Sequence, residues 1–133
     1  MSLLFNAIEE FKQDIENILQ NYRKGHKIYY SLDLPENTVN SYNSSILYIE
    51  NIEIFYNNNQ IQIKIPVSLT YFYLPKTSDL TKDLLNLTND LTLNYSQKIL
   101  NNCVVLFKGV NINPDIEGYL IEMIFEIIVI TRR

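Results

Sequence analysis

The chain has 133 residues, of which 47% are hydrophobic and 20% are charged, and its net charge is −4 at pH 7. This length fits a single domain over residues 1–133, and the composition supplies a core, unlike that of a disordered chain. The 11 basic residues are scattered among 15 acidic ones, whereas a duplex-binding domain normally carries a basic face. We therefore do not expect specific nucleic-acid binding.

Two features of the sequence bear on the compartment. Residues 1–6 lack the basic start of a signal peptide, and no stretch reaches the ~18 apolar residues of a transmembrane helix. Cys103 is the only cysteine, so no internal disulfide is possible. We expect a cytosolic protein of bacterial or viral type without membrane association.

Residues 4–24 predict an amphipathic helix. Its apolar residues recur at spacings of three and four and form one stripe: Leu4, Ile8, Phe11, Ile15, Ile18 and Tyr22. Gly25 follows in a position suited to capping the C-terminus. His26 is expected just beyond it, either in solvent or interacting electrostatically with the helix C-terminus. The stripe is expected to pack on a sheet of the same domain; pairing with a partner helix is the alternative.

Residues 28–32 predict an edge strand or an extended arm, and residues 33–45 predict a loop. The loop holds a proline and several Asn and Ser residues, and connections of thirteen residues often bind other molecules. Tyr29, Tyr30 and Tyr42 lie in or beside it. Because tyrosine combines a large apolar area with a polar tip, we interpret these three as interface residues.

A long hairpin is predicted next, with strands at residues 46–56 and 61–73 and three consecutive asparagines as its turn. Asn tolerates the positive φ that hairpin turns require. The second strand alternates apolar and polar residues over a length of ~40 Å, more than a usual strand spans. We expect this hairpin to project beyond the domain, and Pro66 suggests that part of it is a sheet edge.

The last part of the chain predicts a second helix at residues 80–100 and a second hairpin at residues 103–131. The helix carries its own apolar stripe: Leu80, Leu84, Leu87, Leu91 and Tyr95. In the final strand one phase is wholly apolar, while the other mixes aliphatic residues with Glu122 and Glu126. That mixed face is expected to lie in part under another chain.

The predicted fold class is therefore α+β. A two-layer arrangement, with an antiparallel sheet of two hairpins (one of them long) against two helices, accounts for the pattern. The expected order is α-β-β-β-α-β-β.

Groups suited to catalysis are scarce in this sequence. It has three isolated glycines and no phosphate-binding loop, no metal-ligand spacing, and only His26 as a base for Cys103. Cys103 lies in an apolar run and is interpreted as a buried hydrophobic residue. We expect no enzyme activity, no catalytic residue, no cofactor and no metal.

The layout consists of a helix at residues 4–24, an overlong hairpin at 46–74, a helix at 80–100 and a hairpin at 103–131. This order and the chain length resemble the tail-terminator or tail-completion proteins of tailed bacteriophages. The resemblance implies a ring, usually a hexamer, that ends the tail tube and offers a surface for joining the head. It further implies a place in the virion tail and assembly in the cytoplasm of the bacterial host. The implied partners are further copies, the tail tube protein and a neck or connector protein, with DNA passing through the ring.

The expected function is thus that of a structural assembly protein of a phage or phage-like tail. The alternative is a small non-catalytic adaptor, or an interaction module of a neck, baseplate or secretion system. The candidate interface residues lie at the long loop, at the hairpin tip or on the mixed face of the last strand: Tyr29, Tyr30, Asp33, Tyr42, Asn58, Gln60, Glu122 and Glu126.

Overall fold

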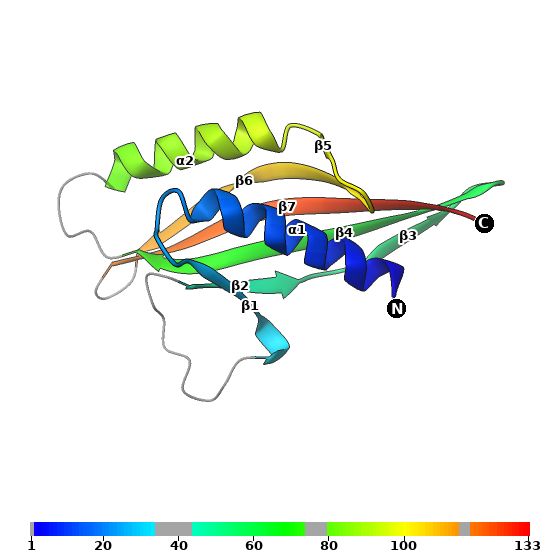
Figure 1. Ribbon diagram of the computed structural model, residues 1–133, viewed down its shortest axis with the longest axis horizontal. Helices are drawn as coiled ribbons and strands as arrows, with labels where there is room; N and C mark the ends of the chain where they lie inside the picture. Colours follow the sequence, from blue (N-terminus) through cyan, green and yellow to red (C-terminus); the bar gives the residue numbers. More distant parts are fainter. Residues whose placement is uncertain (1, 34–43, 74–79, 115–117) are drawn as a thin grey trace.

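A computed structural model describes residues 2–33, 44–73, 80–114 and 118–133 (Figure 1). Its elements in chain order are α1 (Leu3–Leu19), β1 (Lys27–Tyr30), the 3-10 turn η1 (Ser31–Asp33), β2 (Ser44–Ile49), β3 (Glu53–Tyr56), β4 (Gln60–Tyr73), α2 (Leu80–Asn94), β5 (Lys98–Ile99), β6 (Val104–Pro114) and β7 (Tyr119–Arg132). The α+β class is confirmed, with the order α-β-β-β-β-α-β-β-β.

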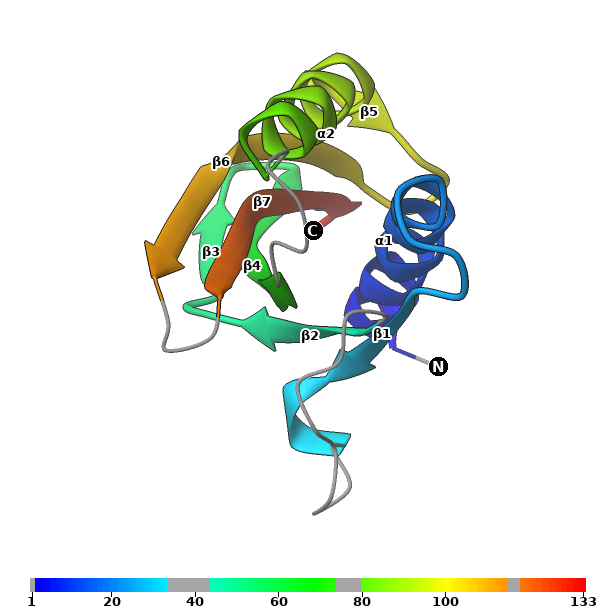
Figure 2. The same ribbon diagram turned by 90° about the vertical axis from the view of Figure 1, so that its left-hand side faces the viewer.

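The seven strands form one sheet that curls strongly into a half-barrel (Figure 2). The strand order is β1-β2-β4-β7-β6-β5, and β3 pairs with β4 beyond the end of β2. The sheet is mixed, because β1 pairs with β2 in parallel at one edge. The prediction of a wholly antiparallel sheet was wrong at that edge, while the edge position expected for residues 28–32 is confirmed for β1.

The first strand of the predicted long hairpin is divided into two. β2 and β3 both pair with β4 in antiparallel fashion, and the ladder is interrupted at residues 50–52 between them. The return strand is a single element of 14 residues, as its alternation predicted. The turn at residues 57–59 is also confirmed, but without the positive φ invoked for it, because the described residues show positive φ only at glycine.

Pro66 lies in the middle of β4, which is a central strand, so the prediction of a sheet edge there was wrong. The Pro66 carbonyl accepts a 3.0 Å hydrogen bond from the Glu50 amide, and its ring nitrogen faces the same side. That side is the interruption at residues 50–52. Proline has no backbone N–H to donate, and at this point β4 has no regularly paired strand that would need one.

One core is formed by the inner face of the sheet and both helices. Phe125 on β7 lies at its centre, with its ring centroid 4.9 Å from Phe11, 5.5 Å from Tyr95 and 5.3 Å from Phe107. The buried phase of each long strand is the apolar phase of the sequence, and buried residues of α1 and α2 belong to the same cluster. The period-two and helical patterns thus predicted the buried faces.

Both helices are shorter than predicted. α1 ends at Leu19, so Gly25, with φ +77°, does not cap it but lies in the turn before β1. α2 ends at Asn94, where Tyr95 turns into the core, and Ile99 is 77% exposed on β5. Neither helix in the described part of the chain is long and apolar enough to span a bilayer.

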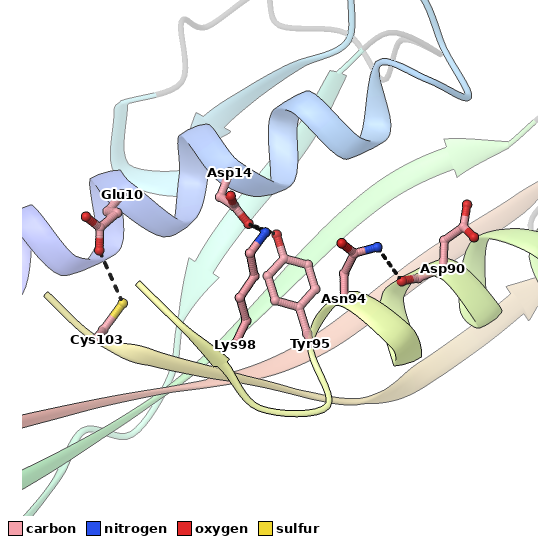
Figure 3. A network of polar contacts seen from close by, with 7 residues as sticks. All are labelled: Glu10, Asp14, Asp90, Asn94, Tyr95, Lys98 and Cys103. Atoms are coloured by element: carbon pink, nitrogen blue, oxygen red, sulfur yellow. Dashed lines mark hydrogen bonds and ion pairs between the residues drawn. The ribbon is translucent and has the colours of Figure 1, made fainter. Parts of the chain in front are cut away.

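Acidic side chains of α1 fasten the helix to the segment between α2 and β6 (Figure 3). Asp14 Oδ2 accepts hydrogen bonds from Tyr95 Oη at 2.6 Å and from Lys98 Nζ at 2.8 Å. One turn earlier, Glu10 Oε1 accepts a hydrogen bond of 2.9 Å from the Asn102 amide. These carboxylates therefore connect parts of the chain more than 80 residues apart.

Candidate interaction surface

Three strand segments project past the N-terminal end of α1 and form an arm (Figure 1). We define the arm as β3, residues 60–65 of β4 and residues 127–132 of β7, which are held together by antiparallel pairing. The arm follows from the length of β4 and β7, each 14 residues, because α1 covers only part of their inner face. The projection of the predicted hairpin is thus observed, with β7 as its third strand.

Apolar side chains are exposed on both faces of the arm. On the inner face Ile54 is 49% and Tyr56 is 66% exposed, and on the outer face Phe55 is 45% and Ile130 is 55% exposed. Ile49 and Ile52, just before β3, are exposed to a similar extent. Several exposed apolar side chains on one projecting segment favour a site of contact with another molecule.

The tip of the arm is basic and polar. Asn59, Gln60, Arg132 and Arg133 line an open hollow of about 460 Å³. Arg133 donates a 3.2 Å hydrogen bond from Nη1 to the Asn57 carbonyl, and its guanidinium lies 5.5 Å from the Tyr56 ring centroid. The predicted tip residues Asn58 and Gln60 are both exposed there, which leaves them available for contact.

The mixed face of β7 lies on the outer side of the sheet. Glu122 and Glu126 are half-buried, and Glu122 Oε1 accepts a 3.0 Å hydrogen bond from Asn111 Nδ2 on β6. Glu126 lies between Pro66 on β4 and Leu106 on β6 in the strand register. Neither helix covers this face, and its mixed character is as predicted.

The tyrosines predicted around the long loop differ in their surroundings. Tyr29 is 37% exposed on the outer phase of β1. Tyr30 instead donates a 2.9 Å hydrogen bond from Oη to Glu9 Oε1 and lies beneath Lys12, whose Nζ is 5.6 Å from the ring centroid. That residue therefore holds β1 against α1.

The other two residues predicted at this loop cannot be assigned to a surface. Asp33 ends η1, but its side chain is outside the described part, as is all of Tyr42 together with residues 34–43. The six predicted interface residues whose side chains the structure describes do not come together. Asn58 and Gln60 lie at the arm tip, Tyr29 and Tyr30 lie on β1, and the two glutamates lie on the outer face of β7.

His26 was expected in solvent, and this prediction was wrong. Its side chain is 1% exposed, with Nε2 2.5 Å from Ser45 Oγ, and Nδ1 has no hydrogen-bond partner among the described residues. Burial, and then the nearby Arg23 charge, lower the pKa of His26 to about 4. The imidazole is therefore neutral near pH 7 and links β1 to β2.

Cys103 is buried as predicted, with Sγ 3.8 Å from the Ala7 carbonyl oxygen. Burial, followed by the charges of Glu10 and Asp14, raises the pKa of its thiol to about 12. A protonated thiol is a poor nucleophile. Within the described ranges, no three His, Cys, Asp or Glu side chains are grouped closely enough to hold a metal ion.

No protein-family model matches the sequence, and no curated protein matches it.

The surface that sequence reasoning missed is β3 itself. Ile52, Ile54 and Phe55 place apolar residues on both phases of the strand predicted at residues 46–56. In the structure both faces are exposed. The signal was present, but whether another part of the chain covers such a strand depends on tertiary arrangement.

Proposed function

We propose that this protein is a structural assembly protein of a phage or phage-like tail, which forms a ring that ends the tail tube and joins it to the neck. The observation that carries the proposal is the arm, with apolar side chains on both faces and none of the described helices over them. Surfaces of this kind are covered by other protein chains in stable assemblies.

A ring accounts for the position of the arm better than a two-fold dimer. The arm projects from one end of the sheet, so a neighbour that covers it leaves its own arm directed at a third copy. Repetition of such a head-to-tail contact closes into a ring when the rotation between copies allows it. The outer face with Glu122 and Glu126 is left for the tube or neck protein.

The first test is the mass of the purified protein, measured by size-exclusion chromatography with light scattering and imaged by negative stain. We expect rings whose mass is a whole multiple of 15.7 kDa, alone or on the ends of tail tubes. A monomer with and without tube protein would contradict the proposal. A stable closed dimer would favour the adaptor alternative instead.

A matched pair of substitutions asks whether the arm makes the contact. Ile130→Asp places a charge on the exposed outer face of the arm, whereas Leu93→Asp places one on α2, where Leu93 is 71% exposed. Both side chains are solvent-exposed in the single chain, so neither change removes core packing. We expect rings from Leu93→Asp and none from Ile130→Asp; rings from both would exclude the outer face of the arm at Ile130 from the interface.

A further inference from the structure

The outer edge of β3 carries unused backbone hydrogen-bonding groups. The Asn57 amide donates to the Gln60 carbonyl at 2.8 Å, which fixes the alternation of the ladder. Residues 53, 55 and 57 therefore bond to β4, and the N–H and C=O groups of Ile54 and Tyr56 point away from it. In the described part of the chain only β4 pairs with β3.

β3 has few of the features that protect a sheet edge from pairing. Natural proteins blunt free edges with proline, lysine, a bulge or a very short strand. β5, at the far edge of the sheet, has only two residues. β3 has no proline, lysine or bulge, and three of its four residues are apolar and exposed. An edge of this composition invites a further strand.

A second open edge lies at the other end of the sheet, on β6. β5 pairs only with Val104 and Val105, and the Phe107 amide donates to the Tyr95 carbonyl at 2.8 Å. Beyond the β-bulge at Lys108, the register with β7 directs the backbone groups of Val110 and Ile112 outward. Figure 2 shows this end of β6 directed away from α2.

The two edges match in length and direction. The open part of β6 covers residues 109–113, between the bulge and Pro114, and β3 has four residues. β3 is antiparallel to β4, β4 to β7, and β7 to β6, so β3 and β6 run in opposite directions within one chain. A second copy in the same orientation, shifted along the sheet, therefore presents β6 antiparallel to β3.

We propose that β3 of one copy pairs with the open edge of β6 in the next copy, at residues 109–111, so that a continuous sheet passes from chain to chain. This rests on the ring proposed above and names the contact that builds it. Ile54 and Tyr56, whose backbone groups point away from β4, have their side chains on the inner face of the sheet, and the same holds for Val110 and Ile112 on β6. Pairing the two edges therefore continues the inner face of one copy into the inner face of the next.

The side chains select one register. In this register Phe55 lies opposite Gly109 of the neighbouring copy. A Cβ atom added to Gly109 would meet no atom within 4 Å, so the aromatic ring of Phe55 has open space to occupy. Ile54 then pairs with Val110, and Glu53 pairs with Asn111. The only charged residue of β3 is Glu53 and the only one of β6 is Lys108, so the two edges carry opposite charges.

Disulfide crosslinking tests this register directly. Glu53 and Asn111 are both exposed, and across the proposed contact they form a non-hydrogen-bonded pair, whose Cβ atoms are close enough to bridge. Glu53→Cys with Asn111→Cys is expected to give a ladder of oligomers on a non-reducing gel. Each single variant serves as control and is expected to stay monomeric. Dimers from Glu53→Cys alone would show β3 paired with β3 and overturn the proposal.

Proline substitutions test the contact without crosslinking. Ile54→Pro and Val110→Pro each remove an outward N–H that the single chain does not use, and edge strands tolerate proline at such positions. Each variant alone is expected to be monomeric by light scattering. Mixed in equal amounts they are expected to form a dimer, a twofold increase in mass, because one intact β3 meets one intact β6.

The outcomes separate this inference from the proposed function. Rings that persist in Ile54→Pro, or fail to crosslink through Glu53→Cys and Asn111→Cys, would overturn the strand pairing and leave the ring standing. A wild-type protein that is monomeric, with no dimer from the proline mixture, would overturn both. Circular dichroism and melting temperature of each variant establish that it is folded.

Discussion

Tyr95 Oη lies 2.6 Å from Asp14 Oδ2, and this hydrogen bond joins the residue just beyond α2 to the middle of α1. The Tyr95 side chain is fully buried, whereas Asp14 is partly exposed and also accepts from Lys98. Burial, with the Asp14 carboxylate next in importance, raises the pKa of Tyr95 well above its usual range. The phenol is therefore a constant donor at any pH the protein meets.

The first prediction concerns this bond. Tyr95→Phe keeps the packed ring but removes a hydrogen bond to a charged group, which contributes about 1.5–3 kcal/mol. We expect the free energy of unfolding in urea to fall by that amount with an unchanged slope. Tyr29→Phe, on an exposed ring, is the control and should change it by less than about 0.5 kcal/mol. Equal effects would show that the Asp14 contact contributes nothing.

The second prediction concerns acid stability. The pKa of His26 is lowered from 6.5 to about 4 in the folded chain, so the unfolded chain binds a proton that the folded chain does not. The contribution of His26 to the free energy of unfolding is therefore fully present above pH 6.5 and is lost as the pH falls toward 4. The slope is up to about 1.4 kcal/mol per pH unit for one proton.

Unfolding curves in urea at several pH values between 7.5 and 4 measure this slope. The matched variant is His26→Gln, which keeps a polar side chain beside Ser45 without the titration. We expect its unfolding free energy to depend less steeply on pH by close to one proton. Identical slopes for wild type and variant would show that His26 does not titrate differently on folding.

Period-two alternation identified the buried faces of β4 and β7 because it depends only on local pleating. Ile65 and Phe125 are both fully buried on the phases predicted for the core. The helical stripe likewise placed Phe11 and Leu91 in the core. Both patterns can be recognised without knowing which elements are neighbours in the fold.

Features that depend on which elements meet were not predictable in this way. His26 is buried because β1 pairs with β2 and brings Ser45 against it, and nothing local in its sequence indicates this. Pro66 suggested a sheet edge because the sequence shows that proline has no N–H to donate. The interruption of the ladder at residues 50–52, opposite Pro66, is not visible in the sequence. The open edges of β3 and β6 also emerge only from strand order.

The third prediction concerns this proline. Pro66→Ala is expected to lower the free energy of unfolding by no more than about 1 kcal/mol, chiefly because the unfolded chain gains freedom. Ser68→Pro should cost about 1–3 kcal/mol, because Ser68 lies opposite Tyr48 in the ladder and its N–H faces β2, so a buried ladder hydrogen bond is lost. Thermal or urea unfolding measures both. A large loss in Pro66→Ala would show that the ring itself packs against the outer face.

The fourth prediction concerns the single thiol. With the pKa of Cys103 raised from 9.0 to about 12, its thiolate fraction at pH 8 is roughly a thousandfold below that of an exposed cysteine. An aromatic disulfide reagent at pH 8 should therefore label the wild type far more slowly than it labels Glu53→Cys.

The same reagent in urea provides the control, because unfolding exposes both thiols and should make their rates equal. Since the thiolate is the reacting species, the native difference reports burial under α1, where Sγ approaches the Ala7 carbonyl. Rapid labelling of the native wild type would show that α1 opens from this part of β6 in solution. Slow labelling also means that Cys103 does not interfere when Glu53→Cys and Asn111→Cys are crosslinked.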